Sequence, residues 1–175
     1  MSQYFDIIQV TPDDLDDLMC VEREVFLDLS ASRETMLERM RSYPAGTWGA
    51  VRGGRMIGFV NSFRVDLDFA PEEYSETDVR TAGRPDGAAL YVASLNVLPR
   101  ERGQGIGTSL MRHILARAHD DGMKRAVLVA SRLSAPLYAR LGFSRVKELP
   151  GFMHTPHPIF PDPVLMEREI SGERM

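Results

Sequence analysis

The stretch Arg102-Gly103-Gln104-Gly105-Ile106-Gly107 lies between a strand-like run, 90–97, and a segment with helical periodicity. Glycine has no Cβ, so the main-chain N–H groups of such a stretch can approach an oxyanion closely. The first N–H groups of the following helix have no partner within that helix, and its dipole adds about half a positive charge there. Arg102 adds a full positive charge. The stretch therefore predicts a diphosphate site at the start of a helix.

The helix after this stretch is indicated by apolar residues at the spacing of one buried face. These residues are Ile106, Leu110, Met111, Ile114, Leu115 and Ala118, and the helix is expected to end near Gly122. On its own, the glycine stretch is also compatible with a loop that caps the helix and binds nothing. It does not match a P-loop, which ends in Gly-Lys-Ser/Thr, or a dinucleotide-binding fingerprint, which needs an acidic residue after a second strand.

A second motif lies downstream of the first. The run 126–130 has the composition of a buried strand, and 134–143 reads Ser-Ala-Pro-Leu-Tyr-Ala-Arg-Leu-Gly-Phe. The order of strand, Arg-x-x-Gly-x-Gly and helix resembles the acetyl-CoA signature of the GCN5-related N-acetyltransferase (GNAT) superfamily. The second motif is similar to the short helix and following strand of that family. The specific motifs cover about 90–146, and the rest of the chain resembles the family only loosely.

The resemblance implies an α/β fold in a single N-acetyltransferase domain, 1–175. Its sheet is expected to be mixed and mostly antiparallel, with helices flanking it. Two central parallel strands, about 90–97 and 126–130, are expected to part and admit the cofactor.

The resemblance also implies acetyl-CoA as the acyl donor and assigns residues to it. The expected cofactor-binding residues are Leu95, Asn96, Val97, Arg102, Gly103, Gln104, Gly105, Ile106, Gly107 and Thr108. Tyr138 is the expected general acid, because in the family a tyrosine at this place lies near the thioester sulfur. A phenol with a pKa of about 10 can protonate a thiolate of similar basicity. Without the motif, Tyr138 is explained as well by a ring packed in the core.

The implied reaction transfers an acetyl group to a primary amine, and a small molecule is the expected acceptor. A non-catalytic acyl-CoA sensor and a protein or peptide N-acetyltransferase are the alternatives. Among the branches of the family, the chain looks most like the arylalkylamine N-acetyltransferases. That branch relays the amine proton through two histidines, and the matching positions here are Tyr91 and Ala93. The substitutes for the missing base are Ser94 through water, His154, Glu22 and Glu24.

Composition bounds the class of protein. The chain has 175 residues, of which 43% are hydrophobic, and no apolar run is long enough to cross a membrane. The N-terminus lacks the features of a signal peptide, and the single Cys20, expected to be buried in a helix, excludes an internal disulfide. A cytoplasmic protein is therefore expected. The formal charge of −4 gives no general attraction to nucleic acid, and the pair His154 and His157 is too little for a metal site.

The N-terminal half predicts a strand and two helices followed by a hairpin. The run 7–10 is typical of an edge strand, and Thr11-Pro12-Asp13-Asp14 is typical of a helix start. A second helix is expected after a Ser32 cap. The runs 48–51 and 56–65 are separated by a short turn with two glycines, which indicates a hairpin.

Two long connections and one sheet edge are candidates for contacts with other molecules. The connection 66–87 holds seven acidic residues and two arginines, a net charge of −5, which favours a cationic acceptor or a merely solvated loop. The connection 150–163 holds Phe152 and Phe160, which are candidates for an aromatic wall beside the acceptor. An exposed sheet edge near 164–170 offers a surface for a homodimer.

Overall fold

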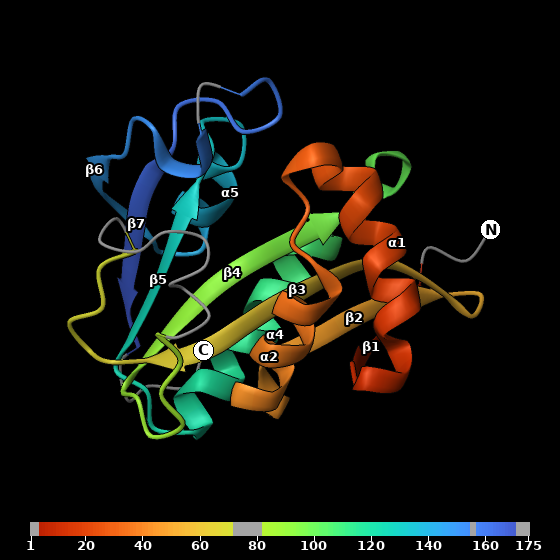
Figure 1. The fold of residues 1–175 in the computed structure, drawn as a ribbon, viewed down its shortest axis with the longest axis horizontal. Helices are drawn as coiled ribbons and strands as arrows, with labels where there is room; N and C mark the ends of the chain where they lie inside the picture. The colour runs from red at the N-terminus through yellow and green to blue at the C-terminus, as the bar shows by residue number, and fades with distance from the viewer. Residues whose placement is uncertain (1–3, 72–81, 155–156, 171–175) are drawn as a thin grey trace.

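The fold is a seven-stranded sheet with helices on both faces, as a computed structural model shows for residues 4–71, 82–154 and 157–170 (Figure 1). The strands are β1 (Asp6–Gln9), β2 (Thr47–Arg52), β3 (Arg55–Val65), β4 (Ala89–Val97), β5 (Arg125–Ala130), β6 (Ser144–Glu148) and β7 (Val164–Glu169). Their order in the sheet is β1-β2-β3-β4-β5-β7-β6. Only β4 and β5 pair in parallel, and the other neighbours are antiparallel. The predicted fold class is confirmed.

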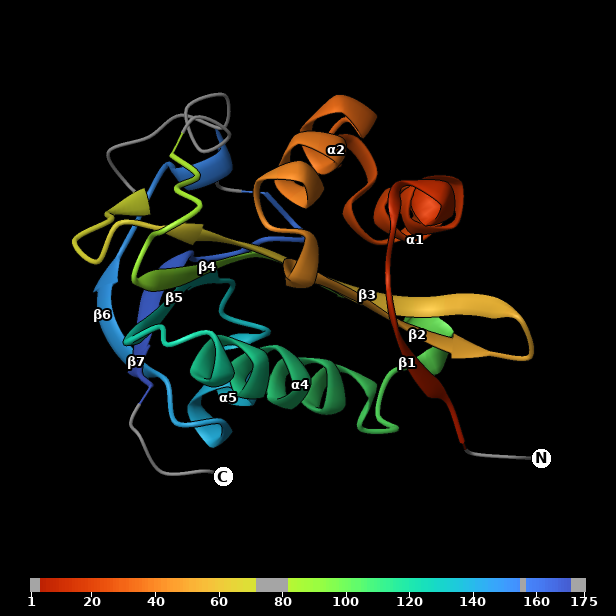
Figure 2. The same ribbon diagram turned by 90° about the horizontal axis from the view of Figure 1, so that it is seen from below.

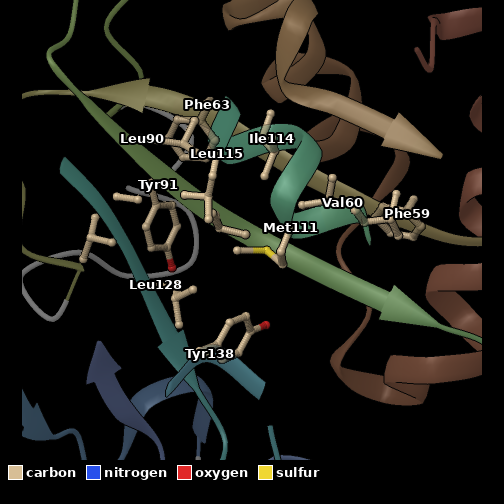
Figure 3. Close-up of a cluster of buried hydrophobic side chains, with 14 of the residues drawn as sticks. Phe59, Val60, Phe63, Leu90, Tyr91, Met111, Ile114, Leu115, Leu128 and Tyr138 are labelled. Carbon is tan, nitrogen blue, oxygen red and sulfur yellow. The ribbon is translucent and has the colours of Figure 1, made fainter. Parts of the chain in front are cut away.

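The helices form two layers, one on each face of the sheet. They are α1 (Leu15–Phe26), α2 (Arg33–Ser42), α4 (Ile106–Asp120) and α5 (Ala135–Arg140). Figure 2 shows α1 and α2 on one face and α4 and α5 on the other. Figure 3 shows buried side chains of α4 against those of the central strands, among them Met111, Ile114 and Leu115 with Phe63 and Leu90.

The starts of both N-terminal helices follow their local sequence. Residues Pro12–Asp14 form a 3-10 turn that leads into α1, and the Asp14 carboxylate accepts a hydrogen bond from the Thr11 N–H at 2.9 Å. Ser32 caps α2, because its Oγ accepts the Thr35 N–H at 3.1 Å. Both predicted helix starts are confirmed.

The parallel strands β4 and β5 part halfway along their length. Their register runs from Ala89 opposite Arg125 to Val92 opposite Leu128 and ends there, although β4 continues to Val97. The sequence expectation that these two strands splay is therefore confirmed (Figure 1).

A bulge in β4 lies at the point where the strands part. Against β3, Ser94 is opposite Asn61 and Val92 is opposite Ser62, so that Ala93 is an extra residue. Side chains alternate along a strand, and a bulge reverses the alternation. Tyr91 therefore shares a face with Ser94 and Asn96, which is the face that α1 covers.

Two expectations are wrong. The strand β7 is not an edge, because it pairs with β5 on one side and with β6 on the other, so the homodimer surface expected at 164–170 is not available on that strand. The edge strand on this side of the sheet is β6, and β1 is the edge strand on the other side. Cys20 lies on α1 but is exposed, because it falls outside the apolar face that Leu18 and Met19 form.

The acidic connection 66–87 lies partly outside the described residues, which omit 72–81. In its described part, Asp66 pairs with Arg84 at 3.5 Å. None of the described helices has the length and apolar composition that a membrane span requires. Across the described ranges, no three His, Cys, Asp or Glu side chains form a group suited to a metal ion.

Candidate active site

A cleft of about 1190 Å³ opens where β4 and β5 part. Its lining comes from α1, β4, the start of α4, α5 and the segment that follows β6. The fold thus brings the glycine stretch, the splayed strands and Tyr138 to one cavity, although they are far apart in the sequence.

Most of the predicted cofactor-binding residues line this cleft. They are Leu95, Val97, Arg102, Gly103, Gly105, Ile106, Gly107 and Thr108. Gln104 and Asn96 do not line it. The Gln104 side chain accepts a hydrogen bond from Arg52 at 2.9 Å, and the Asn96 side chain is fully buried on the side of β4 that α1 covers. The binding roles themselves stay predictions.

The start of α4 has the geometry of an anion site. Gly105 precedes the helix with a φ of 80°, a left-handed conformation that favours glycine, and a Cβ at this position would meet no atom within 4 Å. The Ser109 N–H donates to the Gly105 carbonyl at 2.9 Å. The N–H groups of 106–108, which precede that bond, therefore have no acceptor within the helix.

Arg102 adds positive charge beside these N–H groups. Its Nε donates to the carbonyl of Val97 at 3.1 Å, and the residue lines the cleft. Within the described part of the chain, no carboxylate lies within ion-pair distance of Arg102. The arrangement of charge and backbone N–H groups fits a diphosphate.

Tyr138 is in the cleft and is almost completely buried. Only 7% of the residue is exposed, and burial raises the pKa of its phenol above the ordinary value of 10.0. Tyr91 is also buried and lines the cleft; burial raises its pKa to about 12, against the lowering effect of nearby Arg39. Figure 3 shows both rings near the strands that part. Both phenols therefore keep their protons at neutral pH.

The structure separates the four candidates for the base. Glu22 and Ser94 line the cleft. Glu24 is on the surface of α1 and pairs with Arg100 at 2.7 Å, away from the cleft. The side chain of His154 lies outside what the structure describes. Glu22 is 2% exposed, and its carboxylate accepts hydrogen bonds from the Ala31 N–H and from the Asn96 side-chain amide.

Residues 13–143 match the Acetyltransferase (GNAT) family. The chain belongs to this family. It is also 28% identical over 141 residues to serotonin N-acetyltransferase of Mesocricetus auratus, a match that covers 78% of this chain and 66% of the relative. This GNAT chain thus spans slightly less than two thirds of that relative's length.

Solved structures of GNAT proteins share the fold. The loading GNATL domain of CurA from Lyngbya majuscula matches with a TM-score of 0.85 at 19% identity, over 95% of this chain and 98% of that domain. The GphF GNAT-like decarboxylase in complex with isobutyryl-CoA matches with a TM-score of 0.79 at 21% identity, over 95% of this chain and all of that one. At these identities, the likeness establishes the architecture of the GNAT chain.

The other end of the cleft in this GNAT chain has an aromatic wall, defined as Phe26, Phe152 and Phe160. The ring centroid of Phe160 is 6.3 Å from that of Phe26 and 6.5 Å from that of Phe152. His157 holds the connection against the end of α1, because its Nε2 lies 3.2 Å from a carboxylate oxygen of Asp28. The sequence suggested Phe152 and Phe160 for such a wall but not Phe26.

Sequence reasoning also missed Arg39 of α2. This side chain is 8% exposed, lines the cleft and donates to Asn61 Oδ1 at 3.3 Å. Its position between the apolar Met36 and Met40 was the available signal, because an arginine on the inner face of a helix needs a polar partner.

Proposed function

We propose that this GNAT chain transfers the acetyl group of acetyl-CoA to the primary amine of a small molecule, by direct attack of the amine on the thioester. The observation that carries the proposal is the common cleft, which unites the anion site at the start of α4, the parted strands and the phenol of Tyr138. Family membership supports the same reaction class.

The donor binds along one half of the cleft. Its diphosphate accepts hydrogen bonds from the N–H groups at the start of α4, with Arg102 as counter-charge. The pantetheine arm lies between β4 and β5 beyond Val92, where β5 no longer pairs with β4. In this proposal, those main-chain N–H groups of 95–97 that do not bond to β3 polarise the thioester carbonyl, which is the usual means of stabilising an oxyanion.

The chemistry needs a neutral amine and a protonated leaving group. An alkylammonium with a pKa of about 10 loses its proton at pH 7 at a cost of about 4 kcal/mol. The amine nitrogen then forms a bond to the carbonyl carbon, the carbon–sulfur bond breaks, and the nitrogen releases its surplus proton to water. The Tyr138 hydroxyl gives its proton to the sulfur and is reprotonated from solvent, so that an amide and free CoA thiol leave.

The acceptor half of the cleft favours an amine with an apolar body. Besides the aromatic wall, its lining includes Val25, Leu29, Met153 and Ile159. Burial of an aromatic ring against such a surface contributes binding energy, while the amine itself needs only room near the thioester. The name of the relative from Mesocricetus auratus, serotonin N-acetyltransferase, supports an acceptor of this chemistry.

The test is thiol release from acetyl-CoA across a panel of arylalkylamines, polyamines, amino acids and a basic peptide, with mass spectrometry of the products. The proposal expects release to depend on an arylalkylamine and an acetylated amine to appear. Release with the peptide alone would instead identify a protein or peptide N-acetyltransferase. Tight acetyl-CoA binding without release for any acceptor would favour a sensor and contradict the proposal.

A further inference from the structure

The carboxylate of Glu22 connects α1 to two other parts of the cleft. Its Oε1 accepts the Ala31 N–H at 2.9 Å, and its Oε2 accepts the side-chain N–H of Asn96. The residue is 2% exposed. A carboxylate so deeply buried is costly unless donors surround it, so these two hydrogen bonds help to determine where it lies.

Asn96 belongs to the part of β4 that β5 does not hold. Pairing with β5 ends at Val92, whereas β3 continues beside β4, with Phe59 opposite Asn96. The approach of β3 is close, because a Cβ at Gly58 would lie 2.8 Å from the Asn96 carbonyl oxygen. Thus β3 holds this segment within the sheet, and Glu22 holds it from the helix layer.

Ala31 belongs to the connection between α1 and α2. It lines the cleft and directly precedes Ser32, the residue that caps α2. Ser30 strengthens the same connection, because its Oγ donates to the Leu27 carbonyl at 2.7 Å. One carboxylate therefore links the start of α2 to the β4 segment whose residues Leu95 and Val97 line the cleft.

We propose that Glu22 is a positioning residue and not the base that accepts the amine proton. It fixes the backbone of 95–97 relative to the connection between α1 and α2, and so sets the distance between the thioester and the acceptor. Misplacement of reacting groups by about 1 Å can lower the rate by about 100-fold, so loss of this link is expected to slow the reaction. The inference rests on the proposed function only for its turnover measurement.

The side-chain oxygen of Asn96 allows a positioning role of Glu22 to be tested separately from a role as the base. Among the described residues, no group donates a hydrogen bond to Asn96 Oδ1. In Glu22→Gln, the new amide can still accept the Ala31 N–H and can donate to Oδ1 once the Asn96 amide turns over. Both links survive in this variant, whereas a proton acceptor is lost.

The experiment compares Glu22→Gln, Glu22→Ala and the control Glu24→Ala, which removes a surface carboxylate from the same helix. Glu22→Gln is expected to lower kcat by less than about threefold. The decrease of kcat at low pH should be the same in this variant as in the wild type. Glu22→Ala is expected to lower kcat by about 30-fold and to raise the acetyl-CoA Kd several-fold. Glu24→Ala should match the wild type in every measurement.

Any of the following results would overturn the proposal. A loss of about 100-fold in kcat for Glu22→Gln, together with loss of the decrease of kcat at low pH, would make Glu22 the base. Wild-type kcat and Kd in a folded Glu22→Ala would remove any positioning role. If Glu22→Ala does not fold, Asn96→Ala, which removes only one donor, is expected to show the same losses in milder form, and its wild-type behaviour would equally contradict the proposal.

A measurement that needs no turnover separates this inference from the proposed function. Hydrogen exchange of the Ala31 amide is expected to be slow in the wild type and in Glu22→Gln and fast in Glu22→Ala. If the wild type acetylates no amine, the proposed function fails, while the exchange rates and the acetyl-CoA Kd still decide whether Glu22 holds the cleft. Equal exchange in all three proteins would contradict the inference.

Discussion

The ring of Tyr138 packs edge-on against Phe143, with ring centroids 5.9 Å apart and an interplanar angle of 66°. This contact holds the phenol at the cleft through its carbon atoms. We therefore expect Tyr138→Phe to fold normally and to lose only the proton donor. Its kcat should fall by about 100-fold, with KM for acetyl-CoA and amine nearly unchanged, in steady-state thiol release.

The matched control is Tyr43→Phe. Tyr43 is also buried, but its hydroxyl donates to Asp121 and does not face the cleft. Removal of this hydrogen bond should cost about 1 kcal/mol of stability and leave kcat unchanged. Full kcat in Tyr138→Phe would exclude Tyr138 as the acid.

The aromatic wall predicts which acceptors depend on it. Phe160 lies between Phe26 and Phe152, so Phe160→Leu keeps an apolar side chain and removes both ring contacts. We expect KM for an arylalkylamine to rise by about tenfold, because aromatic contacts contribute about 0.5–1.5 kcal/mol beyond area burial. KM for acetyl-CoA should not change. An equal rise for aliphatic polyamines would show that the wall does not recognise a ring.

The pair Trp48 and His113 predicts how stability depends on pH. Their ring centroids are 4.1 Å apart, and burial, followed by the charge of Arg117, lowers the pKa of His113 from its ordinary value of 6.5. The unfolded chain therefore binds this proton more readily than the folded one. The resulting stabilisation is complete above the pKa that His113 has in the unfolded chain. It is lost as the pH falls through the pKa that His113 has in the folded chain.

Urea unfolding at a series of pH values checks this sign. The wild type should lose stability as pH falls below about 6.5, and His113→Gln, which cannot titrate, should lose less over the same range. His119→Gln is the control, because His119 lies beside Asp120 on the surface of the same helix. If the free energy of unfolding depends on pH in the same way in His113→Gln and in the wild type, the lowered pKa of His113 is contradicted.

The sequence predicted the elements whose pattern is local. The apolar spacing in α4 and the Ser32 cap of α2 act within a few residues, so they could be read directly. The strand β6 could not be read from its composition, because all its residues are exposed and no alternation marks its pairing. The expected edge at 164–170 did not account for the pairing of β6 with β7.

The missed features of the site depend on contacts between distant residues. The sequence offered Glu22 only as one of four candidates for the base, whereas its partner in the structure is Asn96, 74 residues away in the chain. Likewise, Phe26 meets Phe160 only because the connection after β6 returns to the end of α1. Periodicity indicates which side of a helix faces inward and does not identify the partner it will contact there.

The most direct test of the donor site is calorimetric titration of acetyl-CoA into the wild type, Gly105→Ala and Gly122→Ala. The two glycines lie at opposite ends of α4 with φ of 80° and 77°, and a Cβ at either would meet no atom within 4 Å. Both substitutions should therefore cost a similar 1–2 kcal/mol or so of stability. We expect Gly105→Ala to weaken binding by about tenfold or more and Gly122→Ala to leave it within about twofold. Equal affinities in the two variants would contradict a diphosphate site at the start of α4.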